Sequence, residues 1–217
     1  KQWKPKAYAG TYGANGFYLP MRSGQYTQDE TGTTLNLINN TIVKGFKPQT
    51  NFNFGSFYFD GADDYVEFND GATLLGSGEF TIELWFHATS LPSNSAVMLV
   101  HSSFELAIAS DKEVSFAPHG EPGTFTHLES GSSVTTGQWY HVVVSRDSSN
   151  NIRMYIDGVY KATVNSSYQF TTSDTAAKIG AHKTNGNKDF NGYITDLRIV
   201  VNQAIYTGTA SFTPPSQ

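Results

Sequence analysis

The chain has 217 residues, of which 38% are hydrophobic, 14% are aromatic and only 15% are charged. Its formal net charge of −5 argues against nucleic acid as the main partner, because phosphate binding needs clustered Lys and Arg. No cysteine is present, which excludes disulfides, a thiol nucleophile and a cysteine-ligated zinc site. No apolar run approaches the roughly 20 residues that a membrane-spanning helix needs, so we expect no membrane insertion. Abundant aromatic residues and glycine favour strands over helices.

Residues 1–50 differ from the rest, and we expect them to form an N-terminal arm and linker before a domain at residues 51–217. Glycines interrupt short aromatic clusters here, and residues 22–34 are polar, which predicts an exposed loop. A segment this short and rich in glycine cannot bury a core of its own. We therefore expect it to pack on the domain or on a neighbouring subunit, which makes a homo-oligomer a candidate state. The chain begins with Lys1 and shows no signal peptide, so we expect a processed product or a piece of a longer chain.

From Phe57 onward, short alternating segments predict an all-β fold. In residues 57–68 (FYFDGADDYVEF), apolar and polar residues alternate on both sides of Asp60-Gly61, which predicts two strands around a tight turn. Turn signals at roughly 8–12-residue spacing, without long helical periodicity, predict an antiparallel sandwich. Further strands are predicted at residues 80–87, 96–102, 104–109, 113–116, 126–129, 138–146, 152–156, 159–164, 178–180 and 192–201. The one segment that could form a helical turn is residues 203–206.

Alternation also assigns the faces of two strands. In residues 80–87 the even-numbered positions are apolar, and Glu83 lies on the opposite face. In residues 192–201 we expect Arg198 on the even-numbered face. An ion pair between Glu83 and Arg198 would satisfy both charges inside or at the edge of the sandwich, so we interpret Glu83 as a structural residue. The even-numbered face of the second strand comprises Ile194, Asp196, Arg198 and Val200.

Three segments in this order resemble the laminin-G-like branch of the concanavalin A-like lectin/glucanase superfamily. They are residues 57–68, residues 139–158 (WYHVVVSRDSSNNIRMYIDG) and residues 190–206 (FNGYITDLRIVVNQAIY). The resemblance implies a two-sheet antiparallel jelly-roll sandwich. Residues 1–20 resemble stretches of structural and tail proteins of tailed bacteriophages, where laminin-G-like domains are often neighbours. This second resemblance implies a location on the virion surface or outside the cell, with other virion proteins as partners.

The superfamily also contains glucanases, which place two or three carboxylates along one strand. A retaining mechanism needs two carboxyl groups about 5 Å apart. The comparable strand here holds Glu83 as its sole carboxylate, with Glu79 just outside it. The six histidines form neither an HExxH motif nor a helical i, i+4 pair, and no Ser, His and Asp arrangement can be singled out. We therefore predict that the chain is not an enzyme, and glycoside hydrolysis is the least favoured function.

Two clusters of oxygen-bearing side chains are candidate calcium sites, since laminin-G-like and pentraxin-like relatives often hold calcium at the rim of the sandwich. Calcium takes about six to eight oxygen ligands. In the second cluster, Asn187 and Asp189 are the candidate ligands. No EF-hand spacing supports either cluster, and a pair of Asx turns is the alternative. The first cluster is Asp60, Asp63 and Asp64, and the second is Asn185, Asn187, Asp189 and Asn191.

Three loops at the rim are candidates for a carbohydrate site, namely residues 89–95, 117–125 and 182–189. Lectin sites combine an aromatic ring, which stacks on a sugar, with amides and carboxylates that bind its hydroxyls. The candidate ligand-binding residues in these loops are His119, Phe125, His182, Asn185, Asn187 and Asp189.

The predicted function is a non-enzymatic recognition or adhesion domain of a virion surface, such as a tail fibre or a capsid-surface lectin. Its predicted ligand is a glycan or a host surface polysaccharide. The alternative is a purely architectural virion protein, which decorates a capsid or joins tail parts without a sugar ligand. The two functions predict different positions for the aromatic residues outside the core. A lectin exposes a few of them in a pocket, whereas an architectural protein buries them against partner chains.

Overall fold

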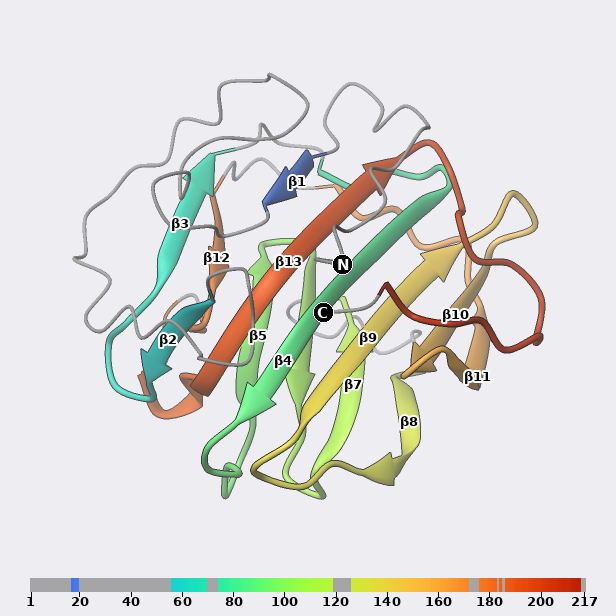
Figure 1. Ribbon diagram of the computed structural model, residues 1–217. Helices are drawn as coiled ribbons and strands as arrows, with labels where there is room; N and C mark the ends of the chain where they lie inside the picture. Colours follow the sequence, from blue (N-terminus) through green and yellow to red (C-terminus); the bar gives the residue numbers. More distant parts are fainter. Residues whose placement is uncertain are drawn as a thin grey trace, which may run out of the picture.

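The structure is a computed structural model that describes residues 17–19, 56–69, 74–118, 126–171, 176–182, 184 and 186–215. Two antiparallel sheets pack against each other around one hydrophobic core (Figure 1). The predicted all-β jelly-roll sandwich is therefore confirmed. In the described part of the chain the one helical element is a 3-10 turn, η1 (Gly186–Lys188).

Seven strands form the first sheet, which faces the viewer in Figure 1. Its order is β1-β13-β4-β9-β10-β11, and β2 also pairs with β13. The order of the six-stranded sheet is β3-β12-β5-β6-β7-β8. The strands of the first sheet are β1 (Phe17–Leu19), β2 (Phe57–Asp60), β4 (Phe80–Ala88), β9 (Trp139–Arg146), β10 (Asn151–Ile156), β11 (Val159–Asn165) and β13 (Asn191–Val201). Those of the second are β3 (Val66–Asn69), β5 (Ala96–His101), β6 (Phe104–Ile108), β7 (Glu113–Ala117), β8 (Leu128–Ser133) and β12 (Ala176–Ile179).

The core is rich in phenylalanine, as the aromatic composition indicates. The ring of Phe80 lies 6.2 Å from that of Phe116 and 5.6 Å from that of Phe170, so side chains of β4 and β7 meet across the sandwich. Such tilted and edge-to-face pairs add to the stabilisation from buried area. The apolar face predicted for residues 80–87 is confirmed, and the buried core residues of β4 are Phe80, Ile82, Leu84, Phe86 and Ala88.

The turn at Asp60-Gly61 joins the two sheets. The predicted pair of strands around this turn is confirmed, but β2 pairs with β13 and β3 pairs with β12. Gly61 has a φ of +84°, and a Cβ atom there would lie 2.9 Å from the Cβ of Asn191. The turn thus requires glycine both for its backbone angle and for its close approach to β13.

A β-bulge in β13 changes one predicted face. Thr195 is opposite Trp85 and Arg198 is opposite Glu83, so two residues of β13 face one residue of β4. The extra residue shifts the alternation by one position. The prediction that Ile194 shares a face with Arg198 is therefore wrong, because Ile194 belongs to the core and Arg198 lies on the outer face. The core residues of β13 are Ile194, Leu197, Ile199 and Val201.

Residues 203–206 form no helix, so the helical turn that the sequence allowed there is absent. The backbone N–H of Ile205 donates to the Thr81 hydroxyl, which itself donates to the carbonyl of Gln203. These bonds hold the segment against β4. They satisfy its backbone without an internal helical turn.

Strand β1 comes from the expected N-terminal arm. It pairs with β13 from Leu197 to Ile199, on the edge that β2 uses from Asn191 to Ile194. This part of the arm thus lies on the sandwich, as expected. The predicted domain boundary at residue 50 lies outside the described residues.

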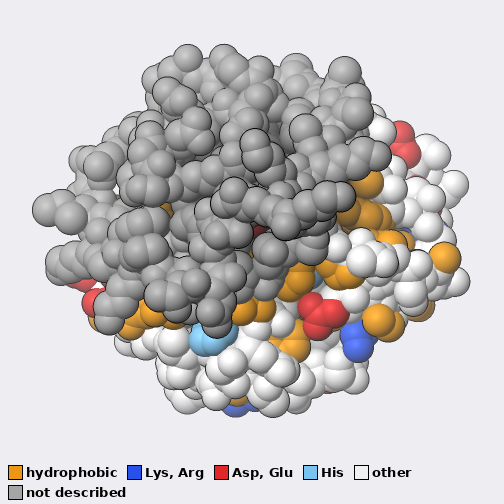
Figure 2. Space-filling view, viewed as in Figure 1, with side chains coloured by type: hydrophobic (Ala, Val, Ile, Leu, Met, Phe, Trp, Pro, Cys, Tyr) orange, Lys and Arg blue, Asp and Glu red, His pale blue; other side chains and the backbone are white. Residues whose placement is uncertain are grey.

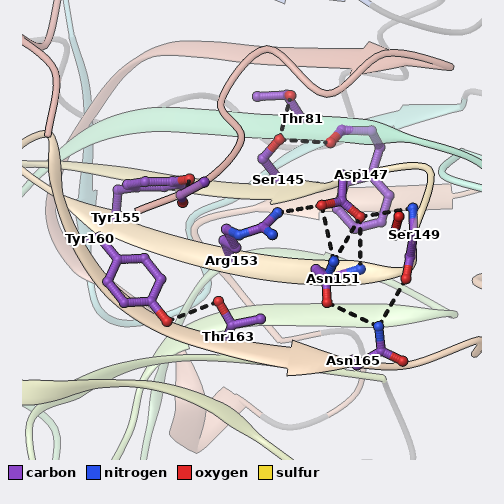
Figure 3. A network of polar contacts seen from close by, with 12 residues as sticks. Thr81, Ser145, Asp147, Ser149, Asn151, Arg153, Tyr155, Tyr160, Thr163 and Asn165 are labelled. Atoms are coloured by element: carbon purple, nitrogen blue, oxygen red, sulfur yellow. Dashed lines mark hydrogen bonds and ion pairs between the residues drawn. The ribbon is translucent and has the colours of Figure 1, made fainter. Parts of the chain in front are cut away.

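The turn between β9 and β10 is held by Asp147 (Figure 3). Its Oδ1 accepts the backbone N–H groups of Ser149 at 2.9 Å and Asn151 at 3.0 Å, and its Oδ2 pairs with Arg153. Burial raises the pKa of the Asp147 carboxyl, but the hydrogen bonds and the charge of Arg153 outweigh it and lower the pKa from 3.8 to about 2. Folding therefore favours the ionised carboxylate.

We predict that Asp147 makes the unfolding free energy depend on pH in acid. Because the pKa is lower in the folded chain than in the unfolded chain, the contribution of Asp147 is complete above about pH 4 and is lost as the pH falls towards 2. Asp147→Asn should lower the unfolding free energy by on the order of 1 kcal/mol at pH 6, since the turn is reached by solvent. Urea unfolding between pH 6 and pH 2 should show the unfolding free energies of the parent and the variant converging as the pH falls from about 4 to about 2. Glu79→Gln is the control, and a gap that stays constant with pH would contradict the assignment.

Candidate functional site

A hollow of about 730 Å³ lies on the outer face of the six-stranded sheet. Its floor comes from β6 and β7, whose residues alternate between the core and this face. Glu105 and Ala107 of β6 and Ser115 and Ala117 of β7 line it, while Phe104, Leu106, Val114 and Phe116 point into the core. The complete lining is Asn94, Ser95, Glu105, Ala107, Ala109, Ser110, Ser115, Ala117, Pro118, His127, His182 and Lys188. We call it the β6–β7 pocket.

The three rim loops predicted from the sequence each contribute to this pocket. The loop of residues 89–95 provides Asn94 and Ser95, and residues 117–125 provide Ala117 and Pro118. The loop of residues 182–189 provides His182 and Lys188. Segments more than 80 residues apart in sequence thus meet over one sheet face.

The pocket is hollow because small side chains form its floor. The central outward positions, Ala107, Ser115 and Ala117, carry small side chains, and Ala107 is only 4% exposed and packs with Val97 and Val100 of β5. Larger side chains at these positions would fill the space. The result is a hollow with small side chains at the centre of its floor and polar side chains around it, which is a common design of ligand sites.

The predicted ligand-binding residues have different positions. His182 lines the pocket, and its Nε2 lies 3.5 Å from Oε2 of Glu105. Asn187 is exposed and lies outside the lining. Three of the six, His119, Phe125 and Asn185, lie outside the described residues.

Asp189 does not line the pocket but holds its wall. Its carboxylate accepts the backbone N–H of His182 at 3.3 Å and that of Asp63 at 3.1 Å. Burial raises the pKa of Asp189 above its ordinary value, and these two hydrogen bonds only partly offset the effect. Asp189 thus fixes the start of the loop that carries His182.

Lys112 holds the opposite wall. Its Nζ donates to the carbonyls of Pro92 and Ser110. These bonds tie the loop of residues 89–95 to the turn between β6 and β7. The sequence analysis missed Lys112, because a lysine that binds backbone carbonyls of another loop has no local sequence signature.

The sequence analysis also missed Glu105, Lys188 and His127. Glu105 could have been found by alternation, since it is the polar residue between buried Phe104 and Leu106 on a predicted strand. Lys188 lay inside a predicted loop but was passed over in favour of amides and carboxylates. His127 precedes β8, where the sequence pattern was weak.

The two predicted calcium clusters adjoin each other. The backbone N–H of Asp63 binds Asp189, and the side-chain amide of Asn191 donates to the carbonyl of Asp60 at 2.8 Å. Carboxylate oxygens of Asp60, Asp63 and Asp64 lie within 4.8 Å of one another, which fits the oxygen ligands that calcium prefers. Asp60 and Asp64 also accept backbone N–H groups within the turn, as the alternative of an Asx turn requires.

Glu83 lies on the outer face of the other sheet, in a polar cluster where its carboxylate contacts three side chains. The predicted ion pair with Arg198 is confirmed. The Tyr206 hydroxyl donates to Oε2 of Glu83 at 2.9 Å, and Nε2 of His141 lies 3.5 Å from that oxygen. Burial raises the pKa of the Glu83 carboxyl, but the hydrogen bond from His141 and the charge of Arg198 outweigh it and lower the pKa. These contacts support the structural role predicted for Glu83.

The C-terminal segment, residues 203–215, crosses this outer face (Figure 1). The ring of Phe212 stacks on Tyr206 at 4.1 Å and lies 5.4 Å from Tyr155. The backbone N–H of Phe212 donates to the carbonyl of Gly158 at 3.0 Å, and a Cβ at Gly158 would lie 1.9 Å from the Phe212 carbonyl. The segment therefore covers the polar cluster around Glu83.

Aromatic rings also gather on the outer face of the seven-stranded sheet near the β2 edge. His87 lies 5.4 Å from Trp139 and 5.7 Å from Tyr193, which itself lies 4.9 Å from Tyr58. Figure 2 shows this side of the molecule, with hydrophobic side chains at the surface beside a histidine. We call Tyr58, His87, Trp139 and Tyr193 the aromatic row.

The fold and the pocket together define a lectin-like sandwich with a polar hollow on one sheet. Residues 60–204 match the family described as the concanavalin A-like lectin/glucanases superfamily, so the chain belongs to this superfamily. The family resemblance of the sequence is thereby confirmed. No curated protein matches the chain.

Solved structures share the fold at low sequence identity. Domain 4 of AbnA, a GH43 extracellular arabinanase from Geobacillus stearothermophilus, in complex with arabinotriose, is 16% identical, with a TM-score of 0.63 over 85% of this chain and 90% of that one. The ligand-binding domain of botulinum neurotoxin serotype D, in complex with N-acetylneuraminic acid, is 13% identical, with a TM-score of 0.66 over 88% of this chain and 48% of that one. The binding domain of Paraclostridial Mosquitocidal Protein 1 is 13% identical, with a TM-score of 0.69 over 90% of this chain and 51% of that one. The chain spans about half of each toxin domain.

Within the described ranges, no helix has the length and apolar character required to cross a bilayer.

We predict that the Glu83–Arg198 pair stabilises the fold. Glu83→Gln or Arg198→Met should each lower the unfolding free energy by about 3 kcal/mol, because either change leaves a buried charge without its partner. The double variant should lose less than the sum of the two. Urea unfolding at neutral pH measures all three. Lys178→Met, which removes a looser pair with Glu67 at 3.9 Å, is the control and should cost less. Additive losses in the double variant would argue against the pair.

Proposed function

We propose that this chain is a non-enzymatic recognition domain that binds a glycan in the β6–β7 pocket. The observation that carries the proposal is the meeting of three distant loops over one sheet face. Polar and charged side chains stand around a hollow whose volume falls in the range of about 300–1,000 Å³ typical of small-molecule sites.

The solved neighbours support the class of ligand. The arabinanase domain is described in complex with arabinotriose, and the neurotoxin domain in complex with N-acetylneuraminic acid. Both are carbohydrates held by proteins with the same sandwich. At this level of identity the likeness shows only the fold, so the ligand of this chain follows from its own pocket.

Within the proposed site, His182 and Glu105 contact the ligand, and Asp189 positions His182. The other residues selected from the sequence, His119, Phe125, Asn185 and Asn187, stay proposed ligand contacts from the loops that border the pocket. An aromatic contribution would come from Phe125, since the described lining holds no Phe, Tyr or Trp.

We also propose that the domain acts outside the cell or on a virion surface, with other virion proteins as partners. The support is the resemblance of residues 1–20 to segments of phage structural and tail proteins. Recognition of a host surface polysaccharide by a tail fibre or capsid-surface module would use such a pocket.

An architectural role is the alternative, and the aromatic row favours it. Three rings of the row are half-buried and Tyr193 is buried, and aromatic side chains are enriched where protein chains contact each other. The row and the β6–β7 pocket lie on different sheets, so the two functions can be tested by separate variants. Glycoside hydrolysis has the least support, because Glu83 is already satisfied by Arg198, Tyr206 and His141.

We predict that variants of the β6–β7 pocket lose glycan binding. Glu105→Gln and His182→Ala should each weaken binding at least about tenfold, since each removes a polar contact from the ligand or its partner. A glycan array identifies ligands of the parent chain, and titration of the strongest ligand measures the loss. Glu67→Gln, an outward carboxylate on β3 of the same sheet, is the matched control. Full binding by both pocket variants would place the site elsewhere, and an array without any ligand would favour the architectural alternative.

We predict that calcium raises the thermal stability through the Asp60, Asp63 and Asp64 cluster. Calcium that binds only the folded chain should add about 2.7 kcal/mol at a concentration of about 100 times its dissociation constant. Asp63→Asn should remove the shift and still fold, because asparagine tolerates the φ of +69° at this position. Melting curves with calcium and with chelator provide the test, and Asp111→Asn is the control. An identical melting temperature for the parent in both buffers would leave the Asx-turn alternative.

A further inference from the structure

The charged side chains of the β6–β7 pocket differ in whether they have an ionic partner. Glu105 and His182 face each other, with Oε2 and Nε2 3.5 Å apart. Lys188, a half-buried residue, lines the same hollow, and its side chain makes no hydrogen bond or ion pair with the described part of the chain. The pocket thus presents one cation that forms no direct ion pair with a described carboxylate.

The loop of residues 89–95 presents an unsatisfied hydroxyl to the pocket. The Oγ of Ser95 is buried and has no hydrogen-bond partner among the described residues. A buried hydroxyl without a partner is costly, so such groups are usually satisfied by water or by a ligand. Asn94 stands next to it at the mouth of the hollow and is exposed. Val97 pairs with Asp189, so the segment that carries these two residues adjoins the segment that carries Lys188. Asn94 and Ser95 can therefore bind sugar hydroxyls close to the cation.

We infer that the β6–β7 pocket selects a sugar that carries a carboxylate, with the carboxylate on Lys188 and hydroxyls on Ser95 and Asn94. This inference rests on the proposed glycan-binding function and names the class of glycan. A neutral sugar would leave Lys188 without a direct ionic partner after water is displaced from the pocket. A carboxylate would supply a charge-assisted hydrogen bond, which is stronger than a neutral one.

Because the whole chain is negatively charged, attraction of an acidic sugar must come from residues in the pocket. At a net charge of −5 the molecule as a whole repels anions, so a surface without a specific cation would disfavour an acidic glycan. Attraction must therefore come from the pocket. It follows that Lys188 is a specificity-determining residue.

The test uses ligands that differ only in charge. Trigalacturonate and its methyl ester have the same rings, and 3′-sialyllactose is compared with lactose. Binding of each probe to the parent chain is titrated by calorimetry. The acid of at least one pair should bind at least about tenfold more tightly than its neutral partner, as a charge-assisted contact predicts. Raising the salt from roughly 50 mM to roughly 500 mM should weaken the acid more than the neutral probe.

Three lysine variants assign the effect to one residue. Lys188→Gln should bring the acid down to the affinity of its neutral partner, and Lys188→Arg should retain the preference. Lys161→Gln, on β11 at the edge of the other sheet, is the matched control and should change nothing. Melting curves of all variants check that each one folds.

The possible results separate this inference from the proposed function. Acidic probes that bind the parent no more tightly than their neutral partners would overturn the selection of acidic sugars and leave glycan binding in place. An acid preference that persists in Lys188→Gln would overturn the assignment to Lys188. If neither these probes nor a glycan array gives binding, the proposed function fails together with the inference.

Discussion

The arrangement depends most on strand β13 and its bulge. One edge of β13 pairs with β4 along almost its whole length, and the other edge takes β2 and β1 in turn. The bulge places Arg198 opposite Glu83 and returns Leu197 to the core. Without the extra residue, alternation would direct the guanidinium of Arg198 into the sandwich, where no partner could balance its cost.

The outer faces of the two sheets therefore hold different features. The outer face of the seven-stranded sheet is taken by the Glu83 cluster, the C-terminal segment and the pairing of β1 at its edge. The outer face of the six-stranded sheet instead has small residues at its centre, which leaves the β6–β7 pocket. The seven-stranded sheet therefore uses its outer face for contacts within the chain. The six-stranded sheet carries the candidate ligand site on its outer face.

Sequence reasoning was strongest where alternation and turn residues act locally. The strands, the core face of β4 and the Glu83–Arg198 pair could all be predicted, because each follows from side-chain period and charge. The bulge could not, since it depends on a positive φ at Asp196 that alternation does not reveal. The segment at residues 203–206 could not be predicted for a related reason: its backbone is satisfied by Thr81, more than 120 residues away in the sequence.

The candidate site also depends on contacts between distant segments, which the local sequence pattern does not reveal. Each rim loop could be recognised by its polar residues, but their meeting over β6 and β7 depends on the order of strands in the sheet. The small floor residues look in sequence like ordinary core positions, so the hollow itself left no signal. Asp189 illustrates the consequence: its residue type suggested a ligand contact, whereas its two backbone partners make it a support for His182. Residue type indicated the chemistry of the loops, and only the fold separates the residues that face the hollow from those that hold it open.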